Sequence, residues 1–361
     1  MGVHLMTGFP GFIASQLIRQ LFMDGVTRQI YAVVLQSEMD KARKEVANIK
    51  AQYPDCQINL FEGDITLPNL GMDNSELACI APRISIVWHL AAIHDLAVAR
   101  ELAWKVNVHG TACVNDFVRT LPNLKRYMYF STAYVAGRRN GRLLENELIR
   151  PVAFKNHYEE TKFEAELRVE DLKCEVPLTI IRPGIVRGHS ETGETIKFDG
   201  LYFLFNMIDT LSTSPLIPYI GSKRATINVV PVDYILKAVS YLCTAVEAEG
   251  KTLHLTDPNP HKVSDVYYAI VKEMTGKRPV GRLPLPMVKK VLANYKIRKR
   301  LGLEYETVDY LAGKGAFDTS EAQSILQKRG IKCPDFIETV PIMVQFYKDN
   351  KHRTQLFIPI K

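Results

Sequence analysis

The sequence predicts an α/β fold: a doubly wound parallel sheet with a smaller, mostly helical C-terminal lobe. Over residues 1–187, short β-rich runs alternate with stretches whose apolar residues have helical spacing. Such alternation is typical of parallel strands connected by helices. Residues 84–90 are nearly continuous apolar, as expected of a strand covered on both faces. A glycine-rich turn directly follows the first run, where an open parallel sheet binds its ligand.

Each element follows from its local pattern. Residues 188–225 interrupt the alternation with glycines, prolines and aromatic residues, and we interpret them as a substrate lobe or lid. Helical spacing returns at residues 230–245, and a mostly helical stretch follows Pro260. We therefore expect a dinucleotide-binding domain at 1–187 and a substrate lobe at 188–361, with 226–257 partly returning to the first domain. The expected strands are 3–7, 30–35, 58–62, 84–90, 126–131 and 178–182, and the expected helices are 12–24, 41–51, 104–120 and 157–172.

Composition narrows the class of protein. The 361 residues are 47% hydrophobic and 24% charged, which are ordinary globular values. A net charge of +7 without a basic arm argues against nucleic-acid binding. No apolar run reaches the length of a membrane span, and no secretory signal is visible. Six scattered cysteines without a Cys-x-x-Cys pair, and no histidine cluster, predict no metal site and a reducing, cytoplasmic location.

The turn after the first strand has the features of a phosphate-binding loop. Gly8 and Gly11 let the backbone turn tightly and approach a pyrophosphate, and a helix begins at once. Ala14 stands where a third small residue allows close packing of helix on strand. A plain strand–helix turn is the alternative. Because the turn follows the first strand, with further βα units behind it, we expect dinucleotide binding and a Rossmann-type sheet.

Tyr158 and Lys162 lie four residues apart on an expected helix, and therefore on one face. A phenol can protonate a carbonyl oxygen while hydride arrives, and a nearby ammonium favours the phenolate. The spacing alone says little, because the chain holds six Tyr-x-x-x-Lys pairs. Context favours this one: Thr132, at the carboxyl end of a strand, could polarise the same oxygen. Asn107, on an expected helix, could order a water beside Lys162 or be an ordinary surface residue.

Together these residues resemble the extended short-chain dehydrogenase/reductase superfamily. Within it the chain looks most like the thioester-reductase branch, which includes fatty acyl-CoA reductases of the male-sterility type. The motifs that carry the resemblance are T-G-x-x-G-F-I-A at 7–14, G-D-I at 63–65, H-L-A-A at 89–92, N-V-x-G-T at 107–111, S-T-A-Y-V at 131–135, Y-x-x-x-K at 158–162 and R-P-G at 182–184. Residues 63–71, 130–135, 197–200 and 229–234 point to the branch.

The resemblance implies roles for individual residues. Thr132, Tyr158 and Lys162 would be catalytic, with Asn107 assisting. Ser131 and Tyr134 would contact substrate. The implied cofactor contacts are Gly8, Phe9, Pro10, Gly11 and Phe12 at the pyrophosphate, Gln36 and Ser37 after the second strand, Asp64 and Ile65 at the adenine, Leu90, Ala91 and Ala92 along the cofactor, Asn107, Tyr158 and Lys162 at the reacting end, and Pro183, Gly184 and Ile185 at the nicotinamide.

The expected cofactor is NADP, with NAD as the alternative. Members of this branch commonly carry an arginine after the second strand to hold the 2′-phosphate, whereas here Gln36 and Ser37 stand there. No acidic residue stands at that strand end either, and Glu38 is the nearest. Ser37, Lys41 and Arg43 are close enough in sequence to serve a phosphate.

Three functions remain open at this point. The first is reduction of an acyl thioester, carried by CoA or by a carrier protein, or of the derived aldehyde. The second is a nucleotide-sugar epimerase or dehydratase, or a hydroxysteroid-type dehydrogenase, on the same fold; Arg187 and Arg224 could then bind phosphate. The third is a dinucleotide sensor without catalysis, which the presence of both Tyr158 and Lys162 disfavours. The oligomeric state is expected to be monomer or homodimer.

Two segments have both a functional and a structural interpretation. The apolar residues at 198–211, with Phe198, Tyr202 and Phe203, could line an acyl tunnel or simply pack on the core. The cations at 289–300 could be a solvated helix face. They could instead receive an acidic carrier protein, a CoA phosphate or an anionic membrane surface, as a peripheral contact.

Overall fold

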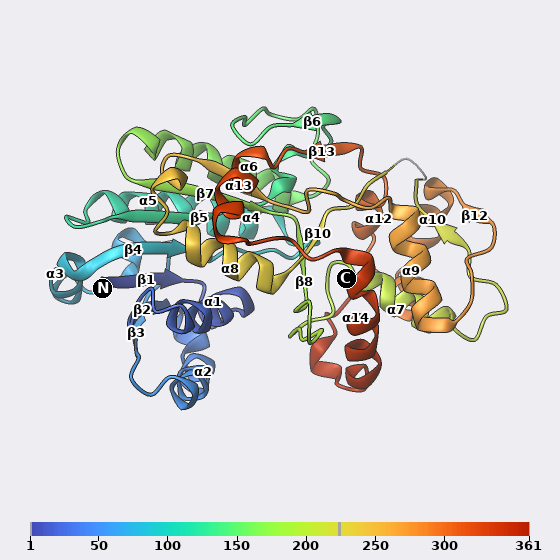
Figure 1. The fold of residues 1–361 in the computed structure, drawn as a ribbon, viewed down its shortest axis with the longest axis horizontal. Helices are drawn as coiled ribbons and strands as arrows, with labels where there is room; N and C mark the ends of the chain where they lie inside the picture. The colour runs from blue at the N-terminus through green and yellow to red at the C-terminus, as the bar shows by residue number, and fades with distance from the viewer. Residues whose placement is uncertain (1, 223–224, 361) are drawn as a thin grey trace.

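The computed structural model describes residues 2–222 and 225–360 and confirms the predicted fold class. Seven parallel strands form one sheet, which occupies the left half of Figure 1. Its order is β3-β2-β1-β4-β5-β7-β11, so the chain winds outward in both directions from β1 and β4. The strands are β1 (Val3–Thr7), β2 (Gln29–Val34), β3 (Gln57–Glu62), β4 (Ile84–His89), β5 (Arg126–Phe130), β7 (Leu178–Pro183) and β11 (Thr252–Leu255).

Two layers of helices cover the sheet. Apolar residues of α1 (Phe12–Met23), α2 (Met39–Gln52) and α8 (Val232–Leu242) share one core with one face of the sheet. The opposite core takes residues from α3 (Asn74–Ile80), α5 (Gly110–Arg119) and α6 (His157–Glu170). All six residues of β4 are buried, because helices cover both of its faces.

A third core holds the helical lobe together at the right of Figure 1. It is built mainly from α7 (Tyr202–Leu211), α9 (Val263–Thr275) and α14 (Phe336–Asn350). Three smaller helices complete the lobe: α10 (Leu285–Leu292), α11 (Tyr295–Leu301) and α12 (Thr307–Tyr310). The chain returns once more to the sheet, where α13 (Ser320–Leu326) packs its Ala322, Ile325 and Leu326 into the core beneath α1 and α8.

Short parallel strand pairs lie outside the main sheet. The pair that begins at Ile185 directly follows β7, at the carboxyl edge where an open α/β sheet binds ligands. The pairs are β8 (Ile185–Arg187) with β10 (Val229–Pro231), β6 (Gly141–Leu143) with β13 (Gly315–Phe317), and β9 (Tyr219–Ile220) with β12 (Arg282–Leu283). In the described part of the chain, no helix is long and apolar enough to cross a bilayer.

Candidate active site

The loop between β1 and α1 is folded tightly against the end of β4. Gly8 has a φ of +88°, and a Cβ there would lie 2.8 Å from the backbone nitrogen of Ala91. A Cβ on Gly11 would lie 2.6 Å from the Gly8 carbonyl oxygen, to which the Gly11 amide already donates. Only glycine fits both positions. The first turn of α1 carries no acidic side chain, so its free amides and positive dipole end fit a pyrophosphate.

Other implied cofactor contacts lie directly after other strands of the main sheet. Gln36 and Ser37 form a tight turn directly after β2, where Lys41 pairs with Glu38 at 2.9 Å. The Asp64 carboxylate accepts a hydrogen bond from the Thr66 amide at 2.8 Å, which holds the turn after β3. Gly184 lies against Asn228: a Cβ there would come within 2.8 Å of the Asn228 Oδ1. Pro183 ends β7 and Ile185 begins β8, so both lie at the carboxyl edge of the sheet.

A chain of hydrogen bonds behind the loop connects the two central strands to α5. The Thr7 hydroxyl lies 2.8 Å from the His89 Nδ1, and the His89 Nε2 lies 3.1 Å from the Thr111 hydroxyl. Burial, assisted by the nearby charge of Lys162, lowers the pKa of His89 to about 3. A neutral His89 therefore accepts from Thr7 and donates to Thr111, which in turn donates to the Asn107 carbonyl at 2.6 Å. Sequence analysis assigned His89 no role, although it begins one of the quoted motifs.

Asn107 lies in a π-helical turn, Trp104–His109, between α4 (Arg100–Ala103) and α5. Its Oδ1 accepts from the Ile93 amide at 2.8 Å. Its Nδ2 donates to the Ile93 carbonyl and to the Thr161 hydroxyl, both at 3.0 Å. The π-helical turn thus lets the buried Asn107 amide connect the loop after β4 with α6. Its partner on α6, Thr161, directly precedes Lys162 in sequence. π-Helical turns are frequent at functional sites.

Thr132, Tyr158 and Lys162 come together at the carboxyl end of β5. The Thr132 side chain lies near the Tyr158 hydroxyl and favours its ionised form. Burial raises the pKa of Tyr158 to about 12, against the lowering effect of Thr132. The Lys162 ammonium donates to the Phe130 carbonyl at 2.6 Å and to the Tyr129 hydroxyl at 3.1 Å. Burial lowers its pKa to about 7, opposed by the charge of Glu166.

The residues expected to contact substrate lie in three different environments. Ser131 is buried and donates a hydrogen bond to Glu166, which pairs with Arg182. Phe198, Tyr202 and Phe203 are buried in the core of the helical lobe, where the Phe198 ring lies 4.9 Å from the ring of Tyr347. This packing accounts for their apolar character without a ligand.

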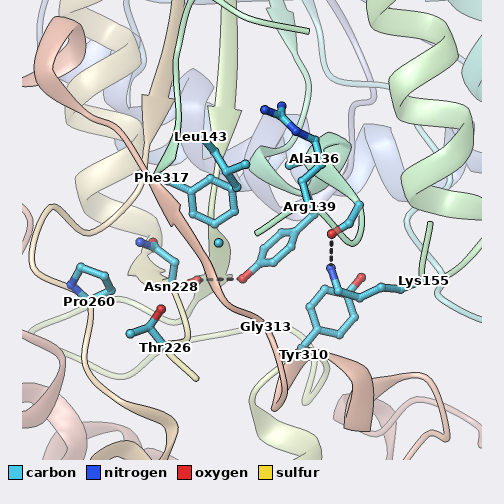
Figure 2. Close-up of a pocket in the computed structure, with 13 residues that line it drawn as sticks. Ala136, Arg139, Leu143, Lys155, Thr226, Asn228, Pro260, Tyr310, Gly313 and Phe317 are labelled. Carbon is cyan, nitrogen blue, oxygen red and sulfur yellow. Dashed lines mark hydrogen bonds between the residues drawn. The ribbon is translucent and has the colours of Figure 1, made fainter. Parts of the chain in front are cut away.

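Tyr134 lines a small pocket at the junction of the two parts, shown in Figure 2. The ammonium of Lys155 lies 5.1 Å from the Tyr134 ring and 4.9 Å from the Tyr310 ring. It also pairs with Glu159 at 3.1 Å. The free space is about 40 Å³, which holds a few waters but no acyl chain.

A wider groove, of about 630 Å³, opens beside the first turn of α6. Residues 96–100 form one wall and residues 154–157 the other. Tyr158 directly follows the second wall in sequence, but its side chain is not among those that line the groove. Sequence analysis did not identify this groove, since its walls are brought together only by folding. Arg224 lies outside the described residues, and Arg187 is buried and donates to the Thr339 hydroxyl at 2.6 Å.

Comparison with known proteins identifies related chains. A model of an NAD-binding family, described as "Male sterility protein", matches residues 6–239. Among curated relatives, "Non-canonical nonribosomal peptide synthetase cpsA" of Aspergillus campestris is 27% identical over 304 residues, which cover 78% of this chain and 28% of that protein. "Fatty acyl-CoA reductase wat" of Drosophila melanogaster is 28% identical over 277 residues, which cover 66% of this chain and 53% of that protein. The chain thus spans about a quarter to a half of these two relatives.

Solved structures support the fold. The terminal R domain of the myxalamid PKS-NRPS pathway has a TM-score of 0.79 at 24% identity, covering 99% of this chain and 92% of that one. A UDP-glucuronic acid 4-epimerase from Bacillus cereus, solved with NAD, has a TM-score of 0.65 at 17% identity, covering 96% and 99%. At these identities the likeness shows the fold alone. The choice between reductase and epimerase therefore depends on the site and on the sequence relatives.

Proposed function

The chain belongs to the NAD-binding family described as male sterility protein, and from this we propose that it reduces an acyl thioester with a nicotinamide dinucleotide. The single observation that supports the reaction most directly is the proximity of the Thr132 side chain to the Tyr158 hydroxyl, whose ionised form Thr132 favours. Two neighbouring hydroxyls can both donate hydrogen bonds to one carbonyl oxygen. The groove at 96–100 and 154–157, whose second wall directly precedes Tyr158 in sequence, gives an extended substrate room nearby.

The proposed reaction starts from the thioester carbonyl. A dihydronicotinamide held by the loop between β1 and α1 would supply hydride to the carbonyl carbon. As the carbon–sulfur bond breaks, the substrate yields an aldehyde and a free thiol, and one proton is taken up overall. Thr132 donates a hydrogen bond to the oxygen, on which negative charge develops, and Tyr158 is the proton donor. Losing one such donor typically costs about 3 kcal/mol of transition-state stabilisation.

Lys162 acts on Tyr158 through charge. Its ammonium is held on the Phe130 carbonyl and the Tyr129 hydroxyl, one helical turn along α6 from Tyr158. A positive charge there lowers the cost of forming the Tyr158 phenolate. Asn107 is a positioning residue, because its hydrogen bonds go to the Ile93 backbone and to Thr161.

The substrate class is proposed from the relatives and the groove. A fatty acyl-CoA reductase and peptide synthetases are among the curated relatives, and a thiolation-reductase di-domain is among the structural neighbours. These support an acyl group carried as a thioester on CoA or on a carrier protein. A sugar nucleotide would need a second phosphate site, and the buried Arg187 already serves Thr339.

Purified protein, NADPH and a long-chain acyl-CoA or acyl-carrier substrate provide the test. We expect free thiol together with aldehyde, or with alcohol if a second hydride follows. Interconversion of a UDP- or GDP-sugar without any thiol release would overturn the acyl proposal in favour of an epimerase.

For the cofactor we propose NADP over NAD. Lys41 and Arg43 are exposed on the first turns of α2, and among the described residues they pair only with their neighbours Glu38 and Asp40. A 2′-phosphate at Ser37 could compete for these cations, whereas no carboxylate lies at the end of β2 to hold a ribose diol. Titration should show tighter binding of NADPH than of NADH, and Lys41→Ala should reduce that difference. Tighter NADH binding would contradict the proposal.

A further inference from the structure

The C-terminal lobe carries an unusual concentration of positive charge. Between Met274 and Leu303 the sequence holds nine lysines and arginines and no aspartate or glutamate. The whole chain has a net charge of only +7, so the remainder of the molecule is slightly negative. These residues form β12, α10 and α11, at the end of the lobe farthest from the N-terminus in Figure 1.

The same segment exposes large apolar side chains. Met287 and Val291, one helical turn apart on α10, are 57% and 51% exposed. Leu283, just before the helix, and Tyr295, just after it, are 37% and 47% exposed. The inner face of α10 is different: Val288 and Leu292 are buried in the lobe core. The core therefore does not account for the outer apolar side chains.

Cations flank this apolar row. Of the cations at 289–300, all of them described residues, four have side chains without a hydrogen-bond or ion-pair partner: Lys290, Lys296, Lys299 and Arg300. By contrast, Lys289 pairs with Asp309 at 2.5 Å. Arg298 donates to the Leu292 carbonyl at 2.8 Å, which fixes α11 against the end of α10. We name Met287, Val291, Tyr295, Lys290, Lys296, Lys299 and Arg300 the basic apolar face.

We propose that the basic apolar face binds the surface of an anionic lipid bilayer. Exposed apolar side chains set among lysines are the pattern of a helix that lies in the headgroup region. The lysine stems can extend along the apolar surface while their ammonium groups reach the phosphates. Each cation near an anionic bilayer adds to the attraction.

Other occupants fit the charges less well. A second copy of the chain would bring like charges together across the interface. An interface with a protein partner would contain fewer lysines, because lysine is depleted at protein interfaces. Three of the four unpartnered cations named above are lysines. A solvated helix face would not need two exposed apolar side chains on consecutive turns.

Vesicle sedimentation of the full chain tests the proposal without any assay of activity, so its result is independent of the proposed reaction. Phosphatidylcholine vesicles are compared with phosphatidylcholine–phosphatidylserine vesicles. We expect binding only to the anionic vesicles, and weaker binding as salt is raised. The charge reversal Lys290→Glu/Lys296→Glu/Lys299→Glu should lower the partition coefficient about 100-fold or more. Met287→Ser/Val291→Ser should lower it about tenfold at unchanged charge.

A matched control reverses three exposed lysines near the sheet, as Lys44→Glu/Lys50→Glu/Lys125→Glu. This variant has the same net charge and should bind nearly as well as the unaltered chain. Equal loss in the control would show a general charge effect and overturn the proposal, as would absence of binding by the unaltered chain. If the unaltered chain does not bind vesicles, and the charge reversal at 290, 296 and 299 raises KM for an acyl-carrier protein, then the basic apolar face binds a protein instead. Unchanged thermal unfolding would show that each variant is folded.

Discussion

At the scale of single residues, burial shifts the two proposed acid–base groups in opposite directions. It raises the pKa of Tyr158 to about 12 and lowers that of Lys162 to about 7, because desolvation favours the neutral form of each. Near neutral pH, Tyr158 therefore holds the proton that the proposed reaction needs. Lys162 is then close to half-protonated, so its charge is sensitive to small changes in pH.

Replacing Tyr158 by phenylalanine should remove the proton donor. We expect Tyr158→Phe to lower kcat by about 10²-fold or more, the scale of general acid catalysis, while cofactor affinity is retained. Tyr268→Phe is the matched control, because Tyr268 also precedes a lysine by four residues but is 41% exposed on α9. Steady-state kinetics with both variants check this. Near-normal turnover of Tyr158→Phe would remove Tyr158 from the mechanism.

The rate should depend on pH through Lys162. The group is charged below its pKa of about 7 and neutral above it, and only the charged form stabilises a phenolate. We therefore expect kcat/KM for reduction to fall as pH rises through about 7. In Lys162→Met this limb of the pH profile should disappear along with most of the activity. If kcat/KM of the variant still falls at the same pH, the titrating group is a residue other than Lys162.

At the scale of elements, α6 is the helix that positions the site. Its N-terminus is capped by the Asn156 side chain, which accepts from the Glu159 amide at 2.9 Å. Further along, Glu166 is fully buried and pairs with Arg182 of β7 at 2.5 Å. The helix is thus fixed at both ends, with Tyr158 and Lys162 between.

Breaking the buried pair should destabilise the protein strongly. Glu166→Gln leaves the Arg182 guanidinium buried without its counter-charge, which typically costs about 3–5 kcal/mol. Glu164→Gln, two residues earlier, breaks only the pair with the half-exposed Arg150 and should cost about 1 kcal/mol or less. Urea unfolding of the two variants measures the difference. Similar losses in both would mean that Glu166 has no special structural role.

The loop between β1 and α1 should tolerate no side chain at Gly8. In Gly8→Ala the Cβ would meet backbone atoms of Leu90 and Ala91 at 2.9 and 2.8 Å, and backbone cannot move aside as a flexible side chain can. Gly250→Ala is the control: its φ is also positive, at +70°, but no atom lies within 4 Å of the new Cβ. The control should lose about 1–2 kcal/mol of stability through backbone strain alone.

We expect Gly8→Ala to lose more stability than this control and also to bind the dinucleotide at least about tenfold more weakly. Cofactor titration and thermal unfolding of both variants check it. Unchanged affinity in Gly8→Ala would show that the loop does not approach the pyrophosphate.

At the scale of the whole molecule, three buried histidines link folding to pH. Burial lowers the pKa of His4, His89 and His254 to about 3, against about 6.5 in an unfolded chain. Between these values the unfolded chain binds more protons than the folded one. Stability is therefore fully present above about pH 6.5 and is lost as pH falls toward 3.

Each of these histidines should contribute about 1.4 kcal/mol per pH unit to the slope of stability against pH in this range. We expect His254→Gln to reduce the slope by that amount between pH 5 and 6. Lost packing would lower stability equally at both values of pH and would leave the slope unchanged. Urea unfolding at a series of pH values distinguishes the two, and an unaltered slope would mean that His254 is protonated in the folded state.

The sequence by itself determined the α/β class, most element positions and the family resemblance. The strand at 84–90 can be identified because burial on both faces requires a continuous run of apolar residues. The helix at 12–24 can be identified because burial on one face places apolar residues three or four positions apart. Residues local to one turn, such as Gly8 and Gly11, could likewise be identified, since backbone conformation at a tight turn restricts residue type directly. The position of Thr132 at the ligand-binding edge could be predicted because the carboxyl ends of parallel strands lie at one edge of a sheet.

Only the tertiary structure decided what depends on contacts between distant segments. The groove between 96–100 and 154–157, the His89 hydrogen bonds and the return of α13 to the sheet each join residues far apart in sequence, and no local pattern records such pairings. The apolar residues at 198–211 show the same limit: an apolar helix is compatible with a tunnel wall or a core. Packing places Phe198, Tyr202 and Phe203 in the core, while it leaves Met287 and Val291 exposed on a helix of similar character. Periodicity shows that a helix has an apolar face, but the neighbours that cover this face are determined by the fold.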